Sequence, residues 1–514
     1  MTSAGGARAA RGAGLLVLQG LAANVASIVY FAFVARLLTV SDYGALSAIG
    51  ILVTMFFVAF SFIQPVAGTR FISSLLATGQ KDGAKGLFFR VFAYATLTGA
   101  VASAMAYFAA PTLVITLVGE SSFVHTMQLA ALDVFFLIVG QFLIGLTTGL
   151  QDFRTVAIAG VCSSLLRSLG SIVALLLGFW VDGVVVVWVL SDFFNVALLA
   201  FVGLRYFGGT ASKAQPLRQL FSYSLPLYLS SLTGYLQSNL DRYILVGLAG
   251  TVSLGIYSPA VSAVGIISGV LSSISTALFP HISGTYDSHG SVPMASALTL
   301  ASRYILYIYV PMAFAVASLA YPTISLFVGA KYIDGAPVLA VLSLVSILNA
   351  FVLPATIVIL ATGRTRINLE ASLLAVVTSL VLSLMLVVPL QSLGAALARA
   401  GLTIVSTAFI AYATSRIMPL TYDRRSLKLS VAASAVMAAC LIGLQLFYSN
   451  KYLLPAYVVV GFFVYALSLR AMRAVALEDF DLLESALSPR LRPLTYWAKR
   501  LVVGKKPDSQ LINS

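Results

Sequence analysis

The sequence predicts an all-α integral membrane protein with about 14 transmembrane helices. Of its 514 residues, 60% are hydrophobic and 9% are charged, whereas soluble domains carry roughly 25% charged residues. Apolar stretches recur along the whole chain, each long enough to cross a hydrocarbon layer of roughly 30 Å as a helix. The sequence also matches itself at a fixed offset, which indicates two related halves and is described below.

The predicted helices cover residues 15–38, 44–68, 89–110, 127–148, 156–179, 184–204, 220–247, 256–279, 301–321, 336–361, 368–389, 394–415, 429–448 and 455–471. An even number of spans places both termini on the same side of the membrane. Most Lys and Arg residues fall in loops on that side, and only Arg36, Lys331 and Lys451 fall on the other. Because basic loops stay in the cytoplasm, the sequence predicts a multi-pass protein of the cell membrane with both termini cytoplasmic.

Several classes of protein are disfavoured by what the sequence lacks. The formal charge of +14 is spread over short loops, so no basic domain is available for nucleic acid. No GxxxxGK[ST] motif occurs, which argues against a P-loop nucleotide site. The three histidines lie in or near loops without metal-ligand partners. We therefore expect no nucleic-acid partner, no cofactor and no metal.

Aligning the sequence with itself at an offset of 211 residues pairs similar residues, mostly glycines and charges near helix ends, of the two halves. It pairs Gly44 with Gly255, Ser47 with Ser258, Gly79 with Gly290, Gly183 with Gly394 and Arg205 with Arg416. The repeat predicts an N-terminal six-helix lobe over 1–210 and a C-terminal six-helix lobe over 211–420, related by a pseudo-two-fold axis along the membrane normal. Two accessory transmembrane helices over 421–471 and a cytoplasmic amphipathic tail over 472–514 follow.

The predicted helix 220–247 carries two adjacent charges, Asp241 and Arg242. Each costs about 2.5 to 3.5 kcal/mol on membrane-insertion scales, so each should face a partner helix or a water-filled cavity. Tyr235, Asn239 and Arg242 share one helical face. The pattern fits a substrate site and fits a helix-locking salt bridge equally well.

A second polar stripe lies in the predicted helix 156–179, where Ser164 and Ser168 flank Arg167. It predicts either a cavity wall with a cation for an anionic ligand, or a close-packed seam in which Arg167 pairs with Asp192. Asp133 and Arg399 are placed near the outer ends of their helices, where we expect them to snorkel to the interface.

Five stretches, in order along the chain, resemble the polysaccharide (O-antigen type) flippases of the multidrug/oligosaccharidyl-lipid/polysaccharide exporter superfamily. They are RLLTVSDYG at Arg36–Gly44, LPLYLSSLTGYLQSNLDRYILVGLAGTVSLGIYS at Leu225–Ser258, LFPHIS at Leu278–Ser283, LFVGAKYIDGAPVLAVL at Leu326–Leu342 and VVPLQSLGAALA at Val387–Ala398. The resemblance implies two six-helix lobes that move polyprenyl-(di)phosphate-linked oligosaccharide from the cytoplasmic to the outer leaflet by alternating access. It also implies lipid-linked glycan and membrane lipid as partners, and glycan-assembly glycosyltransferases or a polymerase as candidate protein partners.

Three functions are therefore weighed. The first is a lipid-linked oligosaccharide flippase, the second a cation-coupled multidrug exporter of the same fold, and the third a membrane glycosyltransferase or polymerase. The third needs acidic catalytic residues on a sizeable outer loop, and the outer loops here are short, so we predict no catalytic residue. The predicted substrate-binding residues are Arg242, Arg167, Asn239, Tyr235, Ser164 and Ser168, and the predicted coupling or ion-pair residues are Asp241 and Asp192.

Overall fold

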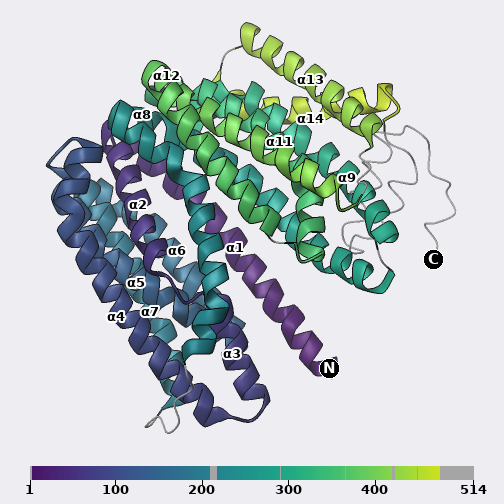
Figure 1. Ribbon diagram of the computed structural model, residues 1–514. Helices are drawn as coiled ribbons and strands as arrows, with labels where there is room; N and C mark the ends of the chain where they lie inside the picture. Colours follow the sequence, from purple (N-terminus) through teal and green to yellow (C-terminus); the bar gives the residue numbers. More distant parts are fainter. Residues whose placement is uncertain are drawn as a thin grey trace, which may run out of the picture. The chain divides into compact units, whose positions relative to one another are not determined.

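The computed structural model describes residues 3–208, 217–289, 291–364, 366–418, 423–448 and 450–474, and these residues form helices joined by short connections (Figure 1). The α-helices are α1 (Ser3–Leu37), α2 (Val40–Phe60), α3 (Pro65–Ala77), α4 (Lys81–Leu113), α5 (Phe123–Gly149), α6 (Phe153–Leu176), α7 (Trp180–Phe207), α8 (Leu217–His289), α9 (Ser291–Ser318), α10 (Ala320–Phe327), α11 (Ala336–Ala361), α12 (Arg366–Ser415), α13 (Arg424–Phe447) and α14 (Leu454–Ala471). Three short segments, η1 (Val114–Val118), η2 (Ala330–Gly335) and η3 (Lys451–Leu453), complete the list. The all-α prediction is confirmed, and the amphipathic tail predicted over 472–514 lies almost wholly outside the described residues.

Within the described part of the chain, 12 helices are long and apolar enough to cross a membrane. Two of them, α8 and α12, each contain one residue outside the helical region of backbone space: Gly250 at φ 78°, ψ 179° and Gln391 at φ 49°, ψ −125°. The predicted helices 220–247 and 256–279 both fall in α8, and 368–389 and 394–415 both fall in α12. A backbone like that of Gly250 is open to glycine and costly for other residues.

The single helix predicted over 44–68 is wrong, because this stretch forms two helices. α2 ends at Phe60, Gln64 is extended at ψ 145°, and Pro65 is the first residue of α3. Proline lacks a backbone N–H and fixes φ near −65°, so it interrupts a helix but starts one well. Pro65 was therefore the sequence signal for this break.

The structure divides into two compact units, and the first comprises Met1–Pro259 and Ser379–Ala398. In this unit α5 packs against α2, α3, α4 and α7, while α6 packs against α1 and α7 (Figure 1). The centre of the packing is aromatic, with the fully buried Phe88 ring stacked on Phe142 and on Phe207. This core fixes α5, α6 and α7, the helices that carry the first group of candidate residues.

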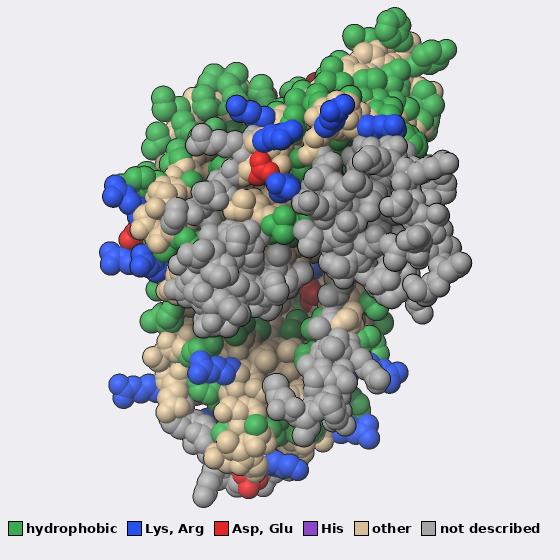
Figure 2. Space-filling view, turned by 90° about the vertical axis from the view of Figure 1, so that its right-hand side faces the viewer, with side chains coloured by type: hydrophobic (Ala, Val, Ile, Leu, Met, Phe, Trp, Pro, Cys, Tyr) green, Lys and Arg blue, Asp and Glu red, His purple; other side chains and the backbone are tan. Residues whose placement is uncertain are grey.

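The second unit comprises Ala260–Thr378 and Arg399–Ser514. Here α9 packs against α11 and α13, and α13 packs against α14, which lies beside it in Figure 1. Outward-facing side chains such as Phe447 and Phe462 are large and apolar, with exposed fractions of 86% and 61%. On the face drawn in Figure 2, hydrophobic side chains gather mainly at the upper end, and Lys and Arg lie in separate groups with few acids among them. Such a surface suits a hydrocarbon solvent.

Candidate functional site

The Arg167 side chain, on α6, forms an ion pair with Asp192 on α7. Its Nη1 donates to Asp192 Oδ2 at 3.0 Å, and its guanidinium stacks over the Trp188 ring at 4.6 Å from the ring centroid. The two side chains of the pair keep 35% and 18% of their surface exposed. Of the two interpretations that the sequence left open, the structure supports the paired arginine, although the pair is not sealed from its surroundings.

A second carboxyl group, that of Asp133 on α5, joins this pair. Asp133 is fully buried and lies against Arg167 and the Asp192 carboxyl, which it reaches through a side-chain hydrogen bond when one of the two carboxyls is protonated. In its ionised form neither of its oxygens accepts a hydrogen bond in the described structure. The expectation that Asp133 snorkels is wrong, because α5 starts at Phe123 and so places Asp133 about three turns inside the helix. The charge group of Asp133, Arg167 and Asp192 therefore has two acids and one base in the interior of the first unit.

Asp192 also faces a small pocket between α2, α3, α5 and α7. The pocket has a volume of about 260 Å³, and its polar lining consists of Asp192, Asn195 and Gln141. Asn195 Nδ2 donates to Ser163 Oγ at 3.4 Å, whereas Gln141 Oε1 is buried without a partner in the described residues. A buried acceptor without a donor costs about 1 to 3 kcal/mol, and among the described residues no donor reaches this oxygen.

The serines predicted to line a cavity mostly serve their own helix. Ser164 Oγ donates to the Gly160 carbonyl at 2.7 Å, and Ser171 Oγ donates to the Arg167 carbonyl at 2.6 Å. Ser164 is half-buried and Ser168 is buried. A hydroxyl bonded to the carbonyl four residues earlier is satisfied without any ligand, so substrate contact by Ser164 and Ser168 stays a prediction.

The second group of candidate residues lies on α8. Arg242 Nη1 donates to Asn239 Oδ1 at 3.3 Å, so these two share a face as predicted, and both are half-buried. Tyr235 lies near Arg242 as well, but its hydroxyl and that of Tyr243, 2.6 Å apart, both donate to the Ile51 carbonyl of α2. Tyr235 therefore anchors α8 to α2, while Asn239 and Arg242 present an amide and a guanidinium side by side.

Asp241 occupies a different face of α8 from Arg242, as adjacent helical residues must. Its carboxylate is fully buried and accepts a hydrogen bond from the Tyr257 hydroxyl. Tyr257 is itself fully buried and lies beyond the interruption at Gly250. Asp241 therefore ties the two segments of α8 together, and its predicted role in coupling stays a prediction.

The start of α2 crosses the α8 segment after Gly250 at very short range. A Cβ at Gly44 would lie 1.9 Å from the Thr251 carbonyl oxygen, and a Cβ at Gly255 would lie 2.1 Å from that of Val40. Next to them, the hydroxyls of Ser41 and Thr251 are 2.8 Å apart. Only glycine permits this approach, because the opposing atoms belong to the backbone and cannot rotate away.

Sequence reasoning missed a cation at the start of α8. Arg218 lines a pocket of about 580 Å³ together with Phe62, Ser222 and Tyr228. The Tyr228 hydroxyl donates to the Ala59 carbonyl at 2.8 Å, which holds the end of α2 against α8. The predicted helix 220–247 leaves Arg218 in the loop before it, but α8 begins at Leu217 and therefore includes Arg218.

Comparison with known proteins places the chain in a family. A family model described as "Polysaccharide biosynthesis protein" matches residues 9–285, which is more than half of the chain and includes the site residues named in this subsection. The capsular polysaccharide biosynthesis protein CapF of Staphylococcus aureus is 29% identical over 229 residues, 44% of this chain. That match spans about half, 53%, of the length of the relative.

Two solved structures share the fold across most of the chain. Lipid II flippase MurJ in an inward closed conformation aligns with a TM-score of 0.71 at 13% identity, covering 89% of this chain and 98% of MurJ. A multidrug resistance MATE family transporter of the MOP superfamily, in an inward-facing conformation, aligns with a TM-score of 0.66 at 15% identity, covering 77% of this chain and 94% of that one. At such identities the likeness concerns the fold alone. The chain therefore belongs to the polysaccharide biosynthesis protein family and adopts the fold that MurJ and the MATE transporters share.

Proposed function

We propose that this protein is a flippase that moves polyprenyl-(di)phosphate-linked oligosaccharide from the cytoplasmic to the outer leaflet by alternating access. The observation that carries the proposal is the Asn239–Arg242 pair, a guanidinium and an amide inside an apolar spanning helix within the family match. Taking a phosphate charge from water into a medium of low dielectric costs of order 20 kcal/mol. A guanidinium offsets much of that cost, because its planar fork of donors matches a phosphate.

The contacts of the two arginines suggest different roles. Arg167 is paired with a carboxylate, Asp192, so its charge is already balanced locally. Arg242 donates to the Asn239 amide oxygen, an acceptor that a phosphate oxygen can replace. Arg242 and Asn239 are therefore the principal phosphate-binding candidates, and Arg167 is a secondary one.

The charge group of Asp133, Arg167 and Asp192 is the candidate for coupling to a cation gradient. With all three side chains ionised it holds one net negative charge in a buried setting, which one bound proton or sodium ion would neutralise. Asp192 reaches the adjoining pocket, whereas Asp133 is closed off. A cation bound at Asp192 would weaken the ion pair between Asp192 and Arg167. Because this pair joins α6 to α7, the gradient would thereby change the packing of these two helices.

The short crossing of α2 and α8 supports a pseudo-two-fold relation between two six-helix lobes. The offset that pairs Gly44 with Gly255 also pairs Val40 with Thr251. Gly44 meets Thr251 and Gly255 meets Val40, so equivalent positions of the two repeats contact each other reciprocally. Reciprocal contact is what a two-fold axis produces at an interface. With α8 and α12 each counted as two spans, the described chain would cross the membrane fourteen times, with both termini in the cytoplasm.

The experiment that tests the function uses the full chain in proteoliposomes with a fluorescent polyprenyl-diphosphate-linked oligosaccharide. Arrival of the glycan in the opposite leaflet is followed by its cleavage with a membrane-impermeant glycosidase. We expect protein-dependent arrival of the glycan and no protein-dependent transport of a cationic dye such as ethidium. Dye transport driven by a pH or sodium gradient, without glycan arrival, would instead establish the multidrug exporter. This is the second candidate function, because the charge group contains two acids that could couple transport to a cation.

A further inference from the structure

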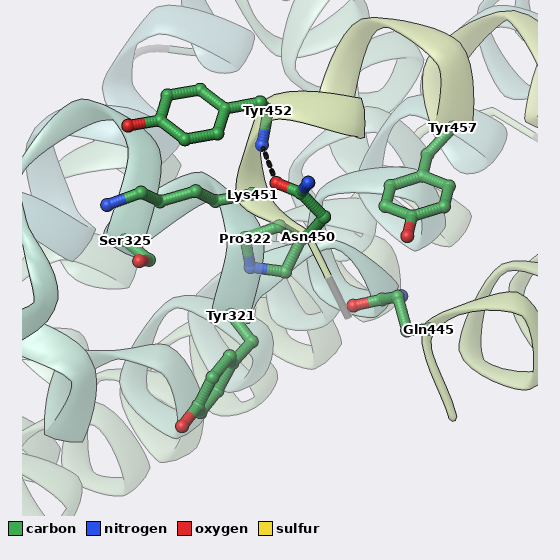
Figure 3. A pocket seen from close by; sticks show the side chains of 8 residues that line it. All are labelled: Tyr321, Pro322, Ser325, Gln445, Asn450, Lys451, Tyr452 and Tyr457. Atoms are coloured by element: carbon green, nitrogen blue, oxygen red, sulfur yellow. Dashed lines mark hydrogen bonds between the residues drawn. The ribbon is translucent and has the colours of Figure 1, made fainter. Parts of the chain in front are cut away.

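A polar pocket lies at the end of the second unit where α9 and α13 end and α14 begins. It has a volume of about 320 Å³ and is open on one side. Its lining comes from α10, α13, η3 and α14 and consists of Tyr321, Pro322, Ser325, Gln445, Asn450, Lys451, Tyr452 and Tyr457 (Figure 3). None of these residues belongs to the sites described above.

Two amides in this pocket are held in fixed orientations. Gln445 Nε2 donates to the Ser318 and Leu441 carbonyls, both at 3.0 Å, so its Oε1 is the atom turned toward the other side chains of the pocket (Figure 3). Asn450 Oδ1 accepts from the Tyr452 N–H at 3.0 Å, so its Nδ2 donors remain available. The pocket thus offers one fixed acceptor and one fixed donor, an arrangement that suits neighbouring hydroxyl groups.

Aromatic rings and one cation complete the lining. The Tyr321 and Tyr452 side chains are 55% and 72% exposed, and in Figure 3 the Lys451 chain extends between them. The Lys451 ammonium lies 5.4 Å from the centroid of the Tyr452 ring and has no carboxylate within ion-pair distance in the described structure. Tyr457 adds only its ring, because its hydroxyl already donates to the Tyr448 carbonyl.

We propose that this pocket binds an acidic sugar residue, a pyranose that carries a carboxylate. The apolar face of a pyranose packs on a tyrosine ring, its hydroxyls match the Gln445 acceptor and the Asn450 donor, and its carboxylate neutralises Lys451. A neutral sugar would leave the ammonium without a counter-charge, and a bare phosphate would use neither the rings nor the Gln445 oxygen, which repels an anion.

The location of the pocket suggests a role for sugar binding in transport. This role rests on the proposed function. α13 begins at the end of the unit where Asp423 and Arg303 lie, and it ends at Phe447 beside the pocket. With cytoplasmic termini, the pocket would open to the outer side of the membrane. It would therefore receive the sugar portion of a lipid-linked glycan after crossing, and oppose its return.

The test measures binding of soluble probes to the full chain in lipid nanodiscs, without any lipid-linked substrate. The probes are tetragalacturonate, the neutral maltotetraose and inorganic phosphate, and binding is followed by saturation-transfer NMR and calorimetry. We expect tetragalacturonate to bind to the wild type. Lys451→Ala and Gln445→Leu should weaken that binding at least about tenfold. Tyr452→Phe should retain the binding, whereas Tyr452→Ala should not. Lys331→Ala is the matched control, because Lys331 also lies over a tyrosine ring, at 5.5 Å, but in η2 outside the pocket.

Equal binding of tetragalacturonate to the wild type and to Lys451→Ala would overturn the proposal, as would equal binding of the neutral probe. Competition by phosphate that depends on Lys451 would overturn it too, in favour of a phosphate or lipid-headgroup site. Thermal unfolding midpoints of the variants identify any that fail to fold. Because no step of this assay involves leaflet crossing, its failure is distinguishable from failure of the proposed flippase activity.

Discussion

Asp133, Arg167 and Asp192 illustrate how single residues set the balance of charge in the interior. Removing one partner of a fully buried ion pair costs about 3 to 5 kcal/mol, and this partly exposed pair should cost less. Arg167→Ala leaves two neighbouring carboxyls without the cation that pairs with them. Asp192→Ala leaves Arg167 beside Asp133, which can take over as its partner.

We therefore predict an asymmetry between these two variants. Arg167→Ala should lower the free energy of unfolding by about 2 to 4 kcal/mol, and Asp192→Ala by less than half of that. The double variant Arg167→Met with Asp192→Leu should recover part of the loss. Unfolding by a denaturing detergent at fixed lipid content measures all three, and a larger loss for Asp192→Ala would contradict the proposed rearrangement.

Asp133 itself lowers the free energy of unfolding, because its carboxyl group is buried. It is buried against the Asp192 carboxyl, and its ionised oxygens accept no hydrogen bond in the described structure, so an apolar residue of similar shape removes a desolvation penalty. Asp133→Leu should raise the free energy of unfolding by about 1 to 2 kcal/mol. If Asp133 belongs to the coupling group, the same variant should transport without dependence on a proton or sodium gradient. A stabilised variant with unchanged gradient dependence would remove Asp133 from the coupling group.

At the scale of the element, Asp423 shows how one cap holds α13 in place. Its Oδ1 accepts from the backbone N–H groups of Arg425 and Ser426, each at 3.1 Å, and its Oδ2 lies 2.7 Å from Arg303 Nη2. Partial burial alone would raise the pKa of Asp423, but the hydrogen bonds from Ser426 and Arg303 prevail and lower it to about 2. An unfolded aspartate has a pKa of about 3.9.

The stability that Asp423 contributes is therefore complete above about pH 4 and is lost as the pH falls through about 2. Asp423→Asn keeps the capping oxygen but not the charge, so its unfolding free energy should depend less on pH in that window. Asp423→Ala should also lose the cap, at about 1 kcal/mol or somewhat more. The exposed Asp334→Asn is the control, and an identical pH dependence in Asp423→Asn and the wild type would contradict the assignment.

The crossing of α2 and α8 makes a second prediction at this scale. Cysteines at positions 41 and 251, in a chain with Cys162 and Cys440 replaced by alanine, should form a disulfide readily, because the native hydroxyls are 2.8 Å apart. Gly44→Ala should slow the disulfide several-fold, since its Cβ would meet a backbone carbonyl at 1.9 Å. Gly50→Ala on the same helix is the control, because its Cβ would make an ordinary contact at 3.6 Å. Equal rates in the two variants would show that the crossing is looser than described.

Particular residues show what the sequence could and could not predict about these elements and this site. Hydropathy finds spanning helices well, because each must be apolar over its whole length. It does not find helix ends, which is why Asp133 was placed near the interface and Arg218 in a loop. Periodicity correctly put Asn239 and Arg242 on one face. It could not show that Tyr235 turns to α2 or that Tyr257 reaches Asp241, because such contacts depend on tertiary packing.

The molecule as a whole combines an apolar exterior with a few interior charges. The exposed hydrophobic surface and the loop cations would hold the protein in the bilayer, and equivalent positions of the two predicted repeats contact each other at Gly44 and Gly255. The central claim is that Arg242, within that apolar frame, carries the phosphate of the lipid-linked glycan across.

The most direct test of that claim is the initial rate of glycan arrival in proteoliposomes for Arg242→Ala and Arg242→Lys. The control is Arg205→Ala, because Arg205 is an exposed residue in the last turn of α7. A charge-assisted hydrogen bond contributes about 1.5 to 3 kcal/mol, which corresponds to roughly a tenfold or larger change in rate. The account predicts a loss of at least about tenfold for Arg242→Ala, a smaller loss for Arg242→Lys and the wild-type rate for Arg205→Ala. Folded Arg242→Ala protein that moves the glycan at the wild-type rate would contradict it.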